Sequence, residues 1–92
     1  MDPRAQMLIE RGRFAEAADC LRAGLAHQPD DPRAHAMLGL CMIDLKRLDA
    51  AEHHLTTAIA FAPDAPLAHN LLAFLRIRQH KLAEARDAAD EA

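Results

Sequence analysis

The chain contains six histidines, and histidine is the side chain that most often binds transition metals or transfers protons near neutral pH. His53 and His54 are adjacent, so on a helix their side chains point about 100° apart, which suits joint ligation of one ion poorly. No H-E-x-x-H motif and no metal-type cysteine–histidine spacing occurs. We therefore expect neither a native metal site nor a cofactor.

Candidate nucleophiles are few. The chain has no serine, and Thr56 and Thr57 carry its only hydroxyl side chains. No glycine-rich phosphate loop or nucleophile elbow is present, so an activated nucleophile cannot be assembled and we do not expect catalysis. Cys20 and Cys41 lie in helical patterns without C-x-x-C spacing, which favours small core residues in a reducing compartment and leaves a disulfide open.

Composition indicates one small helical domain over residues 1–92. The apolar share is 51%, mostly alanine and leucine, with neither tryptophan nor tyrosine. The formal charge of −3 comes without charge blocks, which argues against nucleic-acid binding. No stretch approaches the roughly 20 apolar residues of a membrane span, and no signal-peptide pattern is found, so we expect no membrane insertion and a cytoplasmic location.

The sequence of residues 31–64 predicts a helical hairpin. Asp31 and Pro32 form a start signal, an apolar run continues to Leu45, and Lys46-Arg47 marks a turn. A second helical pattern follows, and Pro63 ends it because proline cannot extend the hydrogen-bond ladder.

The hairpin repeats along the chain. A shift of 34 residues superposes Pro29 on Pro63, His35 on His69 and Leu38 on Leu72. Such a period in an all-helical pattern predicts an all-α solenoid of about three hairpins, over residues 1–31, 32–65 and 66–92, the last incomplete. This period predicts that the third hairpin turns at His80-Lys81, as the first turns at Gly12-Arg13. We therefore expect six helices.

The second repeat has small and apolar residues in a characteristic spacing, at Leu38-Gly39, Ala51, Leu55, Ala58 and Pro63. In these residues the chain resembles the tetratricopeptide repeat family. The resemblance covers nearly the whole chain and implies a right-handed superhelix whose first helices line a concave, peptide-binding groove. The chain departs from the family pattern at the usual tryptophan, replaced by His35 and His69, and at the usual tyrosine, replaced by Met42 and Arg76. We interpret the two histidines as buried or half-buried spacers with a satisfied ring nitrogen.

Helical-wheel positions separate the two helices of each repeat. Apolar residues of the first helix spread over roughly 260° in the second repeat and roughly 220° in the third, far beyond the ~100° stripe of a surface helix. Transfer by position from the family predicts a groove lined by Arg33, Met37, Leu40, Ile43, Asp44, Asn70, Leu71, Phe74, Ile77 and Arg78. In relatives that clamp a peptide carboxylate, polar groups stand where this chain has Leu40, Leu67 and Leu71, so such a clamp is not expected.

We therefore predict a non-catalytic scaffold that binds a protein or peptide in an apolar groove, with Phe74 as its best anchor. Three alternatives stay open. The same apolar residues could pack only against neighbouring helices, or the chain could be the substrate-recruiting arm of a larger enzyme. The third is self-assembly through open solenoid ends, around Met7 and Leu8 at one end and Leu82, Ala85, Ala88, Ala89 and Ala92 at the other. The third repeat stops before its closing proline, so either the chain belongs to a longer array or another chain covers this end.

Overall fold

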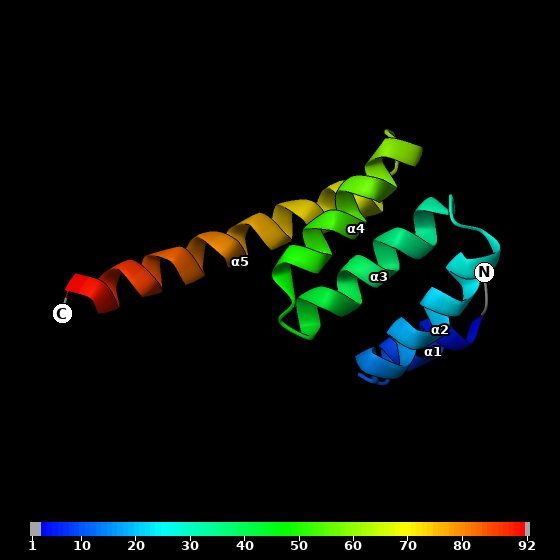
Figure 1. Cartoon of the computed structure of the whole chain (residues 1–92), viewed down its shortest axis with the longest axis horizontal. Coiled ribbons are helices and arrows are strands. Elements are labelled where there is room, and N and C mark those ends of the chain that lie inside the picture. The colour runs from blue at the N-terminus through cyan, green and yellow to red at the C-terminus, as the bar shows by residue number, and fades with distance from the viewer. Residues whose placement is uncertain (1–2, 92) are drawn as a thin grey trace.

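The computed structural model describes residues 3–91, with side chains placed through residue 84. This range contains five α-helices and no strand, which confirms the predicted all-α class. The helices are α1 (Pro3–Glu10), α2 (Phe14–His27), α3 (Pro32–Asp44), α4 (Leu48–Phe61) and α5 (Pro66–Glu91). Helices α1 and α2 form one antiparallel hairpin and α3 and α4 a second, while α5 runs beside the second hairpin and extends well beyond it (Figure 1).

The two hairpin turns have the same hydrogen bonds, one repeat apart. In the first, Arg13 N donates to Leu8 O at 2.8 Å and Gly12 N to Ile9 O at 3.0 Å. In the second, Arg47 N donates to Met42 O at 2.8 Å and Lys46 N to Ile43 O at 3.0 Å. This pattern closes a helix when one residue adopts positive φ, here Gly12 at 76° and Lys46 at 63°. The predicted turns at Gly12-Arg13 and Lys46-Arg47 are therefore confirmed.

Helix starts follow the sequence signals equally closely. The Asp31 carboxylate accepts hydrogen bonds from the backbone N–H of Arg33 at 3.1 Å and of Ala34 at 3.4 Å, so it satisfies two free amides of α3. His35 Nε2 donates to Pro29 O at 2.8 Å, and His69 Nε2 donates to Pro63 O at 2.7 Å. Each histidine thus ties its helix to the preceding turn, which is the satisfied ring nitrogen that we predicted. His35 is half-buried as expected, whereas His69 is exposed.

The core centres on α3, which packs against α2, α4 and α5. Eight residues of α3 are buried, including the wholly enclosed Leu38 and Ile43. From α4 the core receives Ala51, Leu55 and Ala58, and from α5 it receives Ala68 and Leu75. A helix that is apolar on several sides must be covered on several sides, and the position of α3 provides that cover.

The predicted third turn is wrong. Helix α5 continues through His80 and Lys81, so the described residues contain five helices rather than six. The 34-residue period places His80 in register with Gly12 and Lys46, both of which adopt positive φ. Positive φ costs a residue with a Cβ atom about 1–2 kcal/mol. In the described residues, no sixth helix packs against α5 to offset that cost at His80. Instead, His80 Nε2 lies 2.9 Å from Glu84 Oε1, one helical turn later, in a segment whose residues favour a helix.

Candidate interaction groove

An open groove lies where the end of α3, the α3–α4 turn and the middle of α5 meet. Its volume is about 520 Å³. Five apolar side chains form its floor, namely Ile43, Leu48, Phe74, Ile77 and Leu82. Three cations, Lys46, Arg78 and Lys81, complete its lining. We call these eight residues the α3–α5 groove.

The structure brings only part of the predicted groove to this place. Ile43, Phe74, Ile77 and Arg78 line the α3–α5 groove, while Arg33 lines a smaller hollow of about 280 Å³ at the start of α3 and α5. Asp44 and Asn70 are exposed, and Leu40 and Leu71 are half-buried.

Two predicted groove residues belong mainly to the core. Met37 is 6% exposed, and Ile43 is wholly enclosed and reaches the groove only as its floor. Both are covered because α3 is the central helix, packed on α2, α4 and α5. The exposed part of the predicted residue set is therefore narrower than the sequence predicts.

Four groove residues were missed from the sequence, namely Lys46, Leu48, Lys81 and Leu82. The period assigned Lys46 and Lys81 to turns, and Leu48 and Leu82 to the outer helices. Because α5 does not turn at His80, Lys81 and Leu82 stay one to two helical turns beyond Phe74 and Arg78 on the same helix. The signal that could have revealed Lys81 and Leu82 was an unbroken helical period from residue 74 to residue 82.

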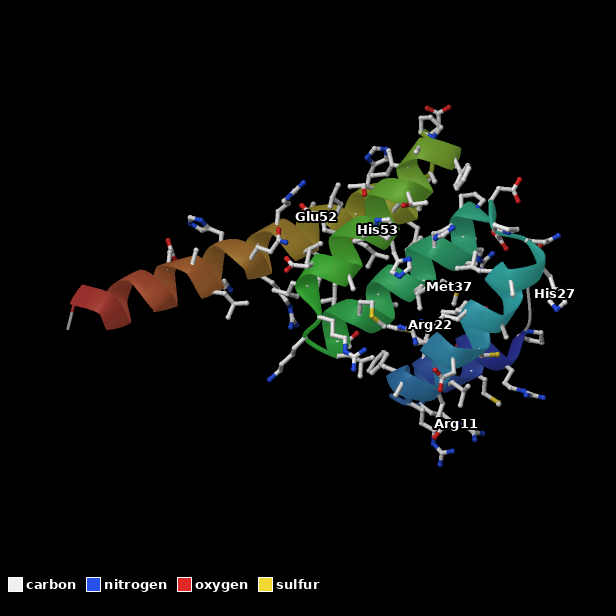
Figure 2. All side chains as sticks on the ribbon, in the orientation of Figure 1. Arg11, Arg22, His27, Met37, Glu52 and His53 are labelled. Atoms are coloured by element: carbon white, nitrogen blue, oxygen red, sulfur yellow. The ribbon has the colours of Figure 1, made fainter. Side chains whose placement is uncertain are left out.

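The groove lining has a positive charge. No acidic residue lies among its eight lining residues. The Arg78 guanidinium carbon sits 4.8 Å from the centroid of the Phe74 ring, which places a cation over an aromatic ring within the groove lining. Arg76 of α5 pairs with Glu52 of α4 and so belongs to a different surface. Glu52 is labelled on α4 in Figure 2.

A larger hollow of about 610 Å³ lies on the outer side of α1 and α2. Its lining mixes Arg4, Glu16, Asp19 and His27 with small residues, and Leu8 is the only large apolar side chain. We favour the smaller α3–α5 groove as the binding site, because ligand sites are mostly apolar with a few convergent polar groups.

Imidazoles gather between α3 and α4. The His35 and His54 rings stack at 5.8 Å between centroids, and His53 meets His54 edge-on at 5.4 Å. The Nδ1 atoms of His35 and His54 are buried without a hydrogen-bond partner. Burial, followed by the charges of His35, His53 and Arg22, lowers the pKa of His54. Within the described range, no cluster of three or more His, Cys, Asp or Glu side chains could hold a metal ion.

Both cysteines are free thiols. Cys41 is wholly enclosed in α3, and burial, with a smaller contribution from the Asp44 carboxylate, raises the pKa of its thiol to about 11. A thiol that stays protonated at neutral pH is a poor nucleophile, so Cys41 acts as a small core residue, as predicted.

A family model described as a tetratricopeptide repeat matches residues 8–75, which run from the end of α1 through α2, α3 and α4 into the first part of α5. Neither the curated proteins nor the solved structures compared with the chain gave a match. None of the helices in residues 3–91 combines the length and the apolar character that crossing a membrane requires.

Proposed function

Because the chain belongs to the tetratricopeptide repeat family, whose members generally mediate protein–protein interactions, we propose that it is a scaffold that binds a protein segment in the α3–α5 groove. Repeats of this family are typically non-catalytic.

The exposed apolar side chains of α5 carry this proposal. Phe74 is 43% exposed and Ile77 is 55% exposed, and both line the groove together with Leu82. Single exposed apolar residues are common on protein surfaces, but a contiguous group in a concave site marks an interaction surface. Aromatic residues are favoured anchors in such sites, which singles out Phe74.

The test is selection of a displayed random-peptide library on the wild-type chain, followed by affinity measurement on variants. We expect Phe74→Ala to weaken selected peptides by about 2 kcal/mol while the chain stays folded, as truncation of a hot-spot residue does. Phe61→Ala is the matched control, because Phe61 is similarly exposed, at 52%, and lies outside the groove.

The alternative, that Phe74 serves packing alone, makes the opposite forecast. In that case Phe74→Ala would cost about 3–5 kcal/mol of stability, as loss of a core phenylalanine does, and would leave the affinity of the surviving folded protein unchanged.

A further inference from the structure

We propose that the partner of the α3–α5 groove is an acidic amphipathic helix of a different protein. This inference rests on the proposed function and adds the chemical class of the partner. The groove offers apolar contacts and three cations, with no acidic residue in its own lining, and such a surface selects a ligand with an apolar stripe flanked by carboxylates.

Three cations line the groove, and they come from two places in the chain. Lys46 is held on the α3–α4 turn by its positive-φ backbone, while Arg78 and Lys81 lie one helical turn apart on α5. All three are exposed. None has an acidic partner among the ion pairs of the described residues, whereas Arg13, Arg22 and Arg76 each have one. The positive potential of the groove is therefore available to a ligand.

The apolar floor decides between classes of anionic ligand. Phe74, Ile77 and Leu82 lie along α5 over eight residues, or about 12 Å at 1.5 Å per residue. That length matches side chains at positions i, i+3 or i+4, and i+7 of a helix laid along the groove. A free phosphate or a nucleic-acid backbone has no apolar groups to cover this floor.

The chain itself contains a segment of similar chemistry. Residues 84–92 have four acidic residues and one arginine, so their net charge of −3 equals that of the whole chain. Residues 84–91 of this segment continue the helix that lines the groove, and a straight helix cannot fold back onto its own side. A second copy could supply them, and the experiment must separate this occupant from a different protein.

The experiment uses two synthetic 15-residue helical peptides with one shared leucine–alanine stripe. One peptide has glutamate at its flanking positions, and its twin has lysine at the same positions. Fluorescence anisotropy measures the affinity of each for the wild-type chain, for Phe74→Ala and for two charge-reversed variants. The groove variant is Arg78→Glu with Lys81→Glu, and the control is Arg11→Glu with Arg13→Glu at the α1–α2 turn. Lys46 is left unchanged because it adopts positive φ in the α3–α4 turn, so a substitution there would also change the stability of the turn.

We expect the glutamate peptide to bind the wild-type chain at least tenfold more tightly than its lysine twin, and to lose affinity as salt rises. The groove variant should bind the glutamate peptide about tenfold more weakly, while the control variant stays within about twofold of wild type.

Four results would overturn the inference. Equal binding of both peptides, with loss in Phe74→Ala, would keep the proposed function and reject the acidic partner. Binding of neither peptide would reject the helix class, whereas glutamate-peptide binding that Phe74→Ala leaves unchanged would count against the proposed function itself. Finally, a concentration-dependent dimer in sedimentation that the groove variant abolishes would identify a second copy as the occupant, in place of a different protein.

Discussion

At the scale of single residues, the histidines fall into two kinds: those that hydrogen-bond to a turn and one whose ring packs between helices. His35 and His69 stand one repeat apart, and each donates its Nε2 proton to a carbonyl of the preceding turn. His54 instead packs its ring against His35, with a buried Nδ1 that has no partner. The charges that act on His54 come from His35 of α3, His53 of α4 and Arg22 of α2, all of which oppose a further proton. Protonation of His54 is therefore unfavourable in the folded state.

This environment predicts a loss of stability in mild acid. The pKa of His54 lies below 6.5 in the folded chain and near 6.5 in the unfolded chain. As pH falls through about 6.5, the unfolded chain binds a proton that the folded chain does not, so the free energy of unfolding decreases until the folded pKa is reached. Thermal melts between about pH 8 and about pH 5 should show this decrease to be smaller in His54→Gln than in wild type.

His27→Gln is the control, because His27 is an exposed imidazole at the end of α2. Its melting temperature should follow that of wild type at every pH. If His54→Gln lost stability as steeply as wild type, the acid sensitivity would have another origin.

At the scale of elements, the α3–α4 pair depends on close approach at Gly39. A Cβ atom on Gly39 would lie 2.7 Å from both Cγ and Cδ2 of Leu55, which is wholly enclosed. The Leu38-Gly39 motif and the later Leu55 are therefore two sides of one contact. Gly24 of α2 is also helical, but a Cβ atom there would meet nothing within 4 Å.

These two glycines should respond oppositely to alanine. Gly39→Ala gains about 1 kcal/mol in helix propensity but overpacks Leu55 at a cost of about 1–3 kcal/mol, so we expect net destabilisation of about 1 kcal/mol. Gly24→Ala has the gain without the clash and should stabilise by about 0.5–1 kcal/mol. Urea denaturation measures both values, and equal effects of the two substitutions would contradict the proposed role of Gly39.

At the scale of the molecule, the described chain is elongated, with extents of 49 × 28 × 19 Å. Its two ends differ. At the α1 end, Met7 is 42% exposed as expected, but Leu8 is 8% exposed and belongs to the core. At the α5 end, Leu82 is 55% exposed, whereas the side chains of Ala85, Ala88, Ala89 and Ala92 lie outside those described.

The exposed Met7 motivates a prediction of self-association through the α1 end. We expect the sedimentation coefficient and the melting temperature to rise with protein concentration, because association stabilises the folded state by mass action. Met7→Glu should abolish the effect by placing a charge in the contact, while Gln6→Glu adds the same charge on the neighbouring exposed residue as a control. A monomer with a constant melting temperature at high concentration would exclude this assembly.

The sequence by itself determined the repeat and nearly all of its boundaries. Asp31, Pro32 and Pro63 act locally, through caps and missing amides, so their effect can be read without knowing the fold. The turns at Gly12-Arg13 and Lys46-Arg47, after which α2 and α4 begin, followed from the polar break between the two helical patterns and from the 34-residue period. The family relation also came from residues whose spacing is visible in the chain.

Only the tertiary structure decided the third turn and the composition of the groove. At Lys46, the packing of α4 on α3 compensates for an unfavourable backbone, whereas no sixth helix packs on α5 to do the same in the described part of the chain. The turn signal at residue 80 is weak, and its outcome depends on contacts far from it in sequence. The unbroken helix in turn placed Lys81 and Leu82 beside Phe74, and the central position of α3 buried Met37. A local pattern can show which residues are apolar, but only packing determines which of them a partner can reach.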